Sequence, residues 1–284
     1  MNEKIFIILF ICIIIGLGIF VGITYSNDYE ETKNIERLEV RLGDKFDLIE
    51  EYNNKYILDY RQADLDKDNI VDDILLIGDK QKVSDNFANN MLVIVRNCAN
   101  GKMYEYNLEG LEGYRAHIEI SRLTNSEVPD ILFTTDSGQK KKQKQFIILK
   151  YSKGKFEQIF DLEKDKGIEL IGKYKDEYIA EIEIKNLNKT INLDLKDKKD
   201  FYQKNNVYDI KNKLVNNEVK IQSKTIDSLE QYVFEDNTNG IITTQKVIGI
   251  NRTDILDEIK TVWKIDNNKL TIISIEGQRC GKIL

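Results

Sequence analysis

The clearest chemistry in the sequence lies in one aspartate-rich stretch. Carboxylates stand at the alternate positions Asp64, Asp66 and Asp68, and a fourth follows at Asp72. Calcium takes about six to eight oxygen ligands at roughly 2.3 to 2.6 Å, and magnesium keeps more of its water. Four clustered negative charges would repel one another without a cation. The spacing therefore predicts one calcium site, with these carboxylates and the backbone carbonyl of Ile70 as ligands.

Two alternatives to this site follow from the same residues. Aspartates also favour solvated turns, because they bond to their own backbone. An EF-hand is excluded, since Leu75 stands where that loop ends on Glu and the run Ile74-Leu75-Leu76-Ile77 is typical of a strand. Asn69 tolerates a left-handed backbone. We therefore expect a calcium loop between two strands.

The elements that must position this loop are mostly strands. Short apolar runs and alternating segments predict strands at residues 74–77, 91–95, 131–133, 146–149, 178–184, 191–195, 261–265 and 270–273. Turn residues between them stand at 152–154, 186–188 and 266–268. Helices are expected only at residues 44–53 and 226–231. The fold class is thus all-β with minor helix and antiparallel sheet.

The loop resembles those of the FG-GAP/VCBS repeat family, which read D-x-D-x-D-G-x-x-D and lie between strands of β-propeller-like blades. Asp64, Asp66, Asp68 and Asp72 match this pattern, whereas Asn69 replaces its glycine. The resemblance extends over about residues 55 to 275. It implies a propeller-like β domain with degenerate repeats.

A second copy of the loop starts about 58 residues later, and it is degenerate. Asp130 keeps the final carboxylate, but Arg122, Thr124 and Ser126 replace the first three, so no metal is expected there. Residues 235–240 resemble a third, more decayed copy.

The N-terminal stretch predicts a membrane anchor. Residues 5–24 are about twenty residues without a charge, which is the length of a helix that crosses a bilayer. Lys4 precedes them and acidic residues follow, so the N-terminus is expected in the cytoplasm and the rest outside the cell. A cleaved signal peptide is the alternative. The predicted organisation is a membrane anchor at residues 1–26, a juxtamembrane spacer at 27–45 and an extracytoplasmic β domain at 46–284, within which residues 194–212 are the best candidate for a domain boundary.

The remaining chemistry-bearing residues give little sign of catalysis. His117 is the one histidine, no nucleophile or phosphate-binding motif occurs, and Trp263 fits a core position. Cys98 and Cys280 could pair, but the sequence leaves this open. The net charge of −6 comes from nearly balanced signs, so nucleic acid is not the expected partner.

These observations favour a non-enzymatic, membrane-anchored structural or interaction module of the bacterial cell envelope. Its expected partners are the membrane and an envelope protein or polysaccharide. An envelope hydrolase that acts on glycan or peptide through acidic residues is the alternative. A sensor is a third possibility, which would need a membrane partner to pass its signal inward.

Overall fold

The computed structural model describes residues 38–137, 144–162, 164–216, 219–223 and 225–284. These residues form two antiparallel β-sheets with only 6% helix, so the predicted all-β class is confirmed. The predicted anchor, residues 1–26, and the first part of the predicted spacer lie outside the described residues. Within the described ranges, no helix is long and apolar enough to cross a membrane.

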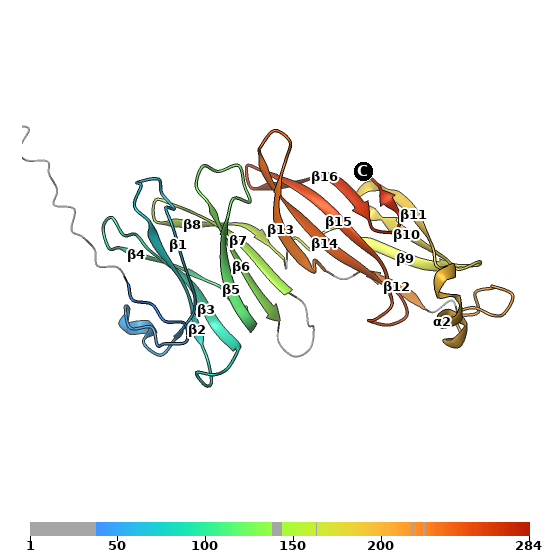
Figure 1. The fold of residues 1–284 in the computed structure, drawn as a ribbon, viewed down its shortest axis with the longest axis horizontal. Helices are drawn as coiled ribbons and strands as arrows, with labels where there is room; N and C mark the ends of the chain where they lie inside the picture. The colour runs from blue at the N-terminus through green and yellow to red at the C-terminus, as the bar shows by residue number, and fades with distance from the viewer. Residues whose placement is uncertain (1–37, 138–143, 163, 217–218, 224) are drawn as a thin grey trace, which may run out of the picture.

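The first sheet consists of two successive four-stranded meanders (Figure 1). The first contains β1 (Tyr56–Ala63), β2 (Asp72–Asp79), β3 (Phe87–Arg96) and β4 (Met103–Asn107). The second contains β5 (Gly113–Ser121), β6 (Asp130–Ser137), β7 (Lys144–Ser152) and β8 (Lys155–Asp161). They are joined where Phe87 and Ala88 pair with Tyr114 and Gly113. β6 starts about 58 residues after β2, which is the spacing at which the sequence predicts a second copy of the loop.

The first sheet curls around an apolar interior to which both meanders contribute. Ile74 and Leu76 of β2 belong to this core together with Phe133 of β6, and the alternate residues Leu75 and Ile77 enter a second core on the outer face. The segment before β1 covers that outer core with Phe46 and forms the 3₁₀ turn η1 (Glu50–Tyr52). β2 is thus buried on both faces, which explains its continuous apolar run.

The second sheet has the strand order β11-β10-β9-β12-β14-β15-β16-β17, and β13 pairs with β14. Its strands are β9 (Leu170–Lys175), β10 (Ile179–Ile184), β11 (Lys189–Asp194), β12 (Lys220–Ser223), β13 (Ser228–Val233), β14 (Asn239–Ile248), β15 (Ile255–Asp266), β16 (Lys269–Gly277) and β17 (Gly281–Lys282). The 3₁₀ turns η2 (Lys185–Leu187) and η3 (Lys196–Lys198) and the short helix α2 (Lys199–Lys204) complete it.

The two sheets share one core. Leu132 of β6, Phe146 of β7 and Phe160 of β8 belong to the same buried cluster as Ile182 of β10 and Trp263 of β15. Trp263 is 9% exposed and its indole Nε1 donates to Thr243 Oγ1 at 2.8 Å, which confirms its predicted core position. The chain therefore buries one face of the second meander against the second sheet.

Most predicted turns are confirmed, and the helices are not. Asn267 and Asn268 have positive φ angles in the β15–β16 turn, as does Asn188 after η2. Residues 44–53 contain only η1, and residues 226–231 run into strand β13, which pairs with β14 because Leu229 alternates into the shared core. This tertiary burial outweighs the local helix signal.

The boundary between the sheets also differs from the predicted seam. The chain leaves the first sheet after Asp161 and enters the second at Leu170, whereas residues 194–212 lie within the second sheet's own connection. Cys98 and Cys280 belong to different sheets and both are free thiols.

Candidate metal centre

The aspartate-rich loop connects β1 to β2 and is held at both ends by the fold. Leu65 is fully buried in the interior of the curled sheet. Its backbone N–H donates to Asp72 Oδ2 at 3.2 Å, so the first buried residue of β2 closes the loop. Asp72 itself is fully buried.

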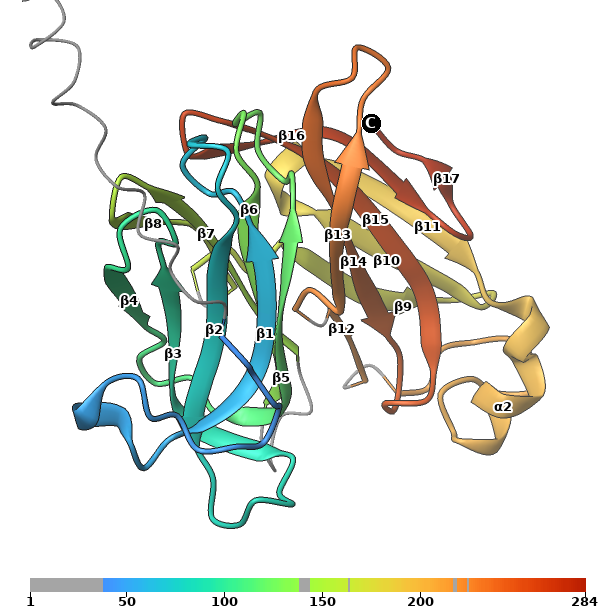
Figure 2. The same ribbon diagram turned by 60° about the vertical axis from the view of Figure 1, so that its left-hand side comes forward.

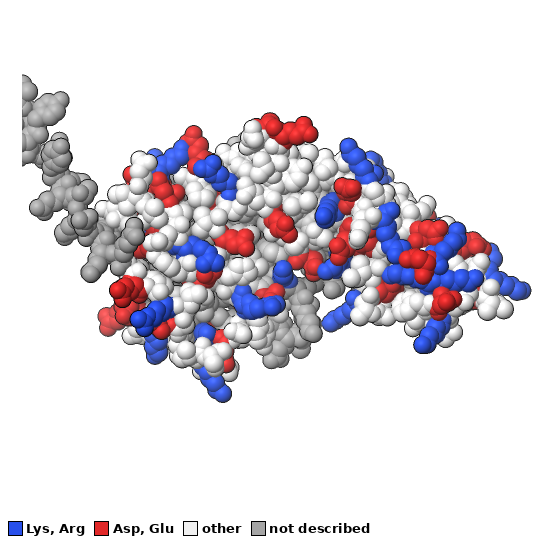
Figure 3. Space-filling view, viewed as in Figure 1, with Lys and Arg blue, Asp and Glu red and all other residues white. Residues whose placement is uncertain are grey.

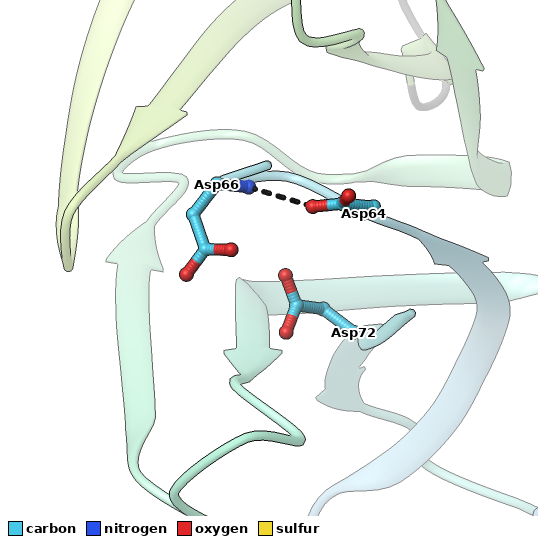
Figure 4. Close-up of side chains that lie close together, drawn as sticks. All are labelled: Asp64, Asp66 and Asp72. Carbon is cyan, nitrogen blue, oxygen red and sulfur yellow. Dashed lines mark hydrogen bonds between the residues drawn. The ribbon is translucent and has the colours of Figure 1, made fainter. Parts of the chain in front are cut away.

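Three of the predicted ligands converge. Carboxylate oxygens of Asp64, Asp66 and Asp72 lie within 4.8 Å of one another, and the side chains turn toward a common space (Figure 4). Two oxygens bound to the same calcium ion lie at most about 5 Å apart, since each is roughly 2.3 to 2.6 Å from it. The hard, anionic oxygen donors and their spread both fit calcium.

The loop backbone supports this convergence. Asp64 Oδ1 accepts the N–H of Lys67 at 2.6 Å, and its Oδ2 accepts the N–H of Asn69 at 3.0 Å. Lys67 and Asn69 both have left-handed φ angles, 68° and 65°. The expectation for Asn69 is confirmed, whereas the left-handed Lys67 was not foreseen. Each carboxylate oxygen has a second lone pair that remains suitable for a cation.

The two other predicted ligands are placed differently. Asp68 is not in the group of converging carboxylates, and its Oδ1 accepts the N–H of Ile70 at 2.7 Å. The structure thus gives Asp68 a local turn-forming contact. Ile70 has an apolar, 38% exposed side chain, so the backbone carbonyl is the group it could contribute.

A second wall of the site comes from the β3–β4 turn, which sequence reasoning missed. Asn97 is 4% exposed, and its Nδ2 donates to Asp66 Oδ2 at 2.7 Å. The backbone N–H of Cys98 donates to Asp72 Oδ1 at 3.1 Å. Nothing in the local sequence around Asn97 indicates this contact, because it depends on the register between β2 and β3.

The electrostatics of the group favour a cation. Burial, reinforced by the neighbouring carboxylates of Asp66 and Asp68, raises the pKa of Asp72 to about 6 despite hydrogen bonds from backbone N–H groups. Burial and the same kind of repulsion also raise the pKa of Asp66. Among the described residues, no Lys or Arg forms an ion pair with Asp64, Asp66 or Asp72. A bound cation would offset both the burial of these carboxylates and the repulsion between them.

The next residue of β2 shows the opposite arrangement. Asp73 points to the other face and is 1% exposed, but Arg96 Nη2 lies 2.7 Å from its Oδ2 and Tyr60 donates to its Oδ1 at 2.5 Å. Burial alone would raise the pKa of Asp73, yet these hydrogen bonds outweigh it and lower the pKa. Arg96 therefore neutralises the buried carboxylate of Asp73, whereas Asp72, the preceding residue of β2, has no cationic partner among the described residues.

The degenerate second loop lies at the same position between β5 and β6. Asp130 is fully buried and accepts the N–H groups of Leu123 at 2.9 Å and Thr124 at 2.8 Å. The Thr124 hydroxyl, which replaces a carboxylate, lies 3.1 Å from the Asp130 carboxylate oxygens. This loop is closed by the same kind of contact as the first loop.

Both loops and the β13–β14 hairpin lie at the same end of the molecule (Figure 2). Lys67 of the first loop forms an ion pair with Glu127 of the second. Asn125 of the second loop accepts the backbone N–H of Asn239 at 2.7 Å. Residues 235–240, the predicted third copy, form the hairpin turn in which Asp236 accepts the N–H and hydroxyl of Thr238.

Fold and site together define an all-β protein with two packed sheets and one carboxylate loop suited to a cation. Residues 168–277 match the family model described as the YybI C-terminal domain, which is well under half of the chain. The match starts just before β9 and ends with β16, so it covers the second sheet and includes neither loop. Neither a curated protein nor a solved structure matches the chain.

Proposed function

We propose that the chain is a calcium-binding structural and interaction module of the bacterial cell envelope, held at the membrane by residues 1–26 with its β domain outside the cell. The observation that carries the calcium part is the convergence of Asp64, Asp66 and Asp72 without an internal cationic partner among the described residues. The anchor and the location rest on the sequence alone.

The proposal includes membership of the FG-GAP/VCBS repeat family, which the loop sequence resembles. The two four-stranded meanders, each with its loop between the first two strands, support a propeller-like arrangement of degenerate repeats. The family match lies outside both loops, so the resemblance depends on this repeat and on the loop geometry.

Calcium would act by stiffening the loop and not by catalysis. It would be held by Asp64, Asp66 and Asp72, and Asp68 and the Ile70 carbonyl complete the proposed ligand set. Each of the two described pockets is lined by one acidic residue, Asp161 in one and Asp85 in the other, so neither pocket offers a pair of carboxylates. The proposed role of the module is recognition, and a hydrolase that acts through acidic residues stays the alternative.

The charge pattern on the face drawn in Figure 3 supports a partner other than nucleic acid. Acidic and basic side chains are interspersed over the face in Figure 3, without a broad basic area. Binding of phosphate backbones requires many basic contacts on one face. An envelope protein or a polysaccharide remains the proposed partner.

The test is a calcium titration followed by thermal unfolding of the protein, with magnesium as the comparison ion. Extracellular calcium modules bind at about 10⁻⁴ to 10⁻³ M, so millimolar calcium should raise the melting temperature more than equal magnesium does. Asp64→Asn and Asp66→Asn should abolish the shift. Asp68→Asn should reduce it if Asp68 joins the ion.

Asp236→Asn is the matched control, because Asp236 forms a similar turn in the β13–β14 hairpin. It should keep the full response to calcium. A wild-type melting curve that calcium leaves in place would contradict the calcium proposal.

A further inference from the structure

The residue that faces the last aspartate of the loop differs between the two hairpins of the first sheet. The antiparallel register of β2 with β3, continued by one residue, places Asn97 directly opposite Asp72. The register of β6 with β7, continued in the same way, places Lys150 directly opposite Asp130. Residues that stand opposite each other in an antiparallel pair lie on the same face of the sheet. The first hairpin thus presents a neutral amide to its aspartate, and the second hairpin presents a cation.

Asn97 is a buried donor whose orientation is fixed by its own turn. It is 4% exposed, and its Oδ1 accepts the backbone N–H of Asn100 at 3.2 Å. The amino group of the amide therefore faces the metal loop, where Nδ2 donates to Asp66 Oδ2 at 2.7 Å. The N–H of Gly101 donates to the Asn97 carbonyl at 2.8 Å and closes the turn. Asp66 is in this way tied to the end of β3.

Both contacts from this turn to the carboxylate group come from neutral donors. Beside the amide of Asn97, the backbone N–H of Cys98 donates to Asp72 Oδ1 at 3.1 Å. A neutral donor orients a carboxylate and leaves its negative charge available, whereas a lysine or arginine would supply the positive charge itself. Contacts of this kind to metal ligands typically contribute about 10- to 100-fold to metal affinity. The first hairpin therefore keeps its carboxylates both oriented and charged.

Lys150 supplies a positive charge to the second hairpin. Asp130 is fully buried, and this burial raises its pKa, but hydrogen bonds from the loop and the charge of Lys150 act in the opposite direction. Thr124 stands in this loop where the first loop has a carboxylate. A lysine of the protein thus faces a buried aspartate there, and the charge of that aspartate is balanced from within the fold.

We propose that Asn97 is a positioning residue of the calcium site and that it makes the first hairpin dependent on the ion. It orients Asp66 toward the cation and leaves the carboxylates charged, whereas Lys150, at the same register position, takes the place of the ion in the second hairpin. This inference rests on the proposed calcium function and names the residue that distinguishes the two hairpins outside their loops.

The experiment combines calorimetric titration of the full chain with calcium chloride and thermal unfolding in chelator. Asn97→Leu removes the donor at nearly constant volume and should raise the dissociation constant for calcium by about 10- to 100-fold. Asn97→Lys should show no saturable binding up to about 10 mM calcium chloride, at least about tenfold above the constant expected for the wild type. In chelator it should melt above the wild type, because the lysine offsets the repulsion between the carboxylates.

Asn97→Asp separates a role at the metal site from a role in the turn. The new carboxylate can still accept the N–H of Asn100, so the turn keeps its contact, but it adds a negative charge beside Asp66. The variant should melt below the wild type in chelator and gain more from calcium than the wild type does. A role confined to the turn predicts no change in either measurement.

Two exposed positions provide matched controls. Gln81→Lys adds the same charge in the β2–β3 turn and should bind calcium as the wild type does. Lys150→Asn should lower the melting temperature in chelator, whereas Lys155→Asn, which changes an exposed lysine at the start of β8, should leave it unchanged.

The outcomes distinguish this inference from the proposed function. A wild type that does not bind calcium contradicts the proposed function and the role of Asn97 with it. A wild type that binds calcium, together with an Asn97→Leu variant that binds it equally well, overturns the role of Asn97 alone, and this comparison holds even where Asn97→Lys does not fold. Equal melting of Lys150→Asn and Lys155→Asn in chelator overturns the role of Lys150.

Discussion

The two β-hairpin loops of the first sheet share their closing contact and their final aspartate, and they differ in the earlier positions that would hold a metal. In both, a fully buried aspartate at the start of the second strand accepts the backbone N–H of a buried leucine, Asp72 from Leu65 and Asp130 from Leu123. The final carboxylate is therefore part of the hairpin structure. Its presence alone does not indicate a metal site.

The differences lie earlier in each loop. Asp66 of the first loop is matched by Thr124, whose hydroxyl lies beside Asp130 and replaces an acidic ligand with a neutral contact. Lys67 and Asn69 of the first loop are left-handed, whereas the described residues between β5 and β6 have no positive φ. The first carboxylates and the loop backbone therefore distinguish the proposed cation site, whereas the last aspartate closes the hairpin in both loops.

The largest expected effect comes from removal of the closing aspartate that both loops share. Asp130→Ala leaves the N–H groups of Leu123 and Thr124 unpaired, and Asp72→Ala does the same for Leu65 and Cys98. At about 1 to 3 kcal/mol for each unpaired buried group, Asp130→Ala should lower the free energy of unfolding by about 3 kcal/mol in chelator. Asp72→Ala should cost less, because it also relieves repulsion within the carboxylate group. Urea unfolding measures both, and a loss below about 1 kcal/mol at Asp130 would refute its role in closure.

The second prediction concerns pH in the absence of metal. The pKa of Asp72 is about 6 in the folded protein against an ordinary value of 3.8, so the folded state binds this proton more tightly. Metal-free stability should therefore fall as pH rises from about 4 to about 6, by up to roughly 3 kcal/mol. Urea unfolding of wild type minus Asp72→Asn isolates this contribution. A difference that stays flat over this range would contradict it.

The same titration predicts how calcium should respond to pH. Calcium binds the deprotonated carboxylate, so the calcium concentration at half saturation should rise as pH falls below about 6. The Asp72→Asn variant has no carboxylate at this position, so the contribution of Asp72 to this pH dependence should be absent from it.

The third prediction uses asparagine to separate the two roles. Asparagine can still accept the N–H of the leucine but brings no negative charge. At 10 mM calcium and a dissociation constant of about 10⁻⁴ to 10⁻³ M, the wild type should gain roughly 1.4 to 2.7 kcal/mol. Asp72→Asn should lose most of this gain, and Asp130→Asn should keep all of it. Equal loss in both variants would mean that the response to calcium does not come from the first loop.

The smallest expected effect concerns the ion pair that links the loops. Lys67 and Glu127 are largely exposed, with side chains 47% and 81% accessible. Exposed pairs contribute about 0 to 1 kcal/mol, so Lys67→Ala and Glu127→Ala should each change stability by less than about 1 kcal/mol, and a double-mutant cycle should give a small coupling. A larger coupling would show that the loops act as one unit.

The sequence predicts the strands well where burial is strictly alternating or continuous. The run of β2 and the Asn267-Asn268 turn are examples, because side-chain period and left-handed residues are local properties. The predicted helix at 226–231 is wrong because Leu229 is buried by strands distant in sequence. The sequence also could not predict the division into two sheets that share a core, since no local composition marks the boundary between them, which lies between β8 and β9.

For the candidate site, the sequence identified the loop but not its walls. Asp64, Asp66 and Asp72 converge, whereas Asp68 turns to Ile70. Their spacing could not distinguish these two outcomes, because spacing does not fix the backbone conformation of the loop, in which Lys67 is left-handed. Asn97 reaches Asp66 only through the pairing of β2 with β3. Such contacts become visible with the tertiary structure.

The core common to both sheets has a practical consequence for anyone who divides this protein. A fragment excised along the family match, from Ile168 to Gly277, would be stripped of Leu132, Phe146 and Phe160. The bare apolar side of its sheet would then meet water or other copies of itself, and aggregation is the expected fate of such a surface. The portion that matches a known domain thus depends, in this chain, on a neighbour that the match does not include.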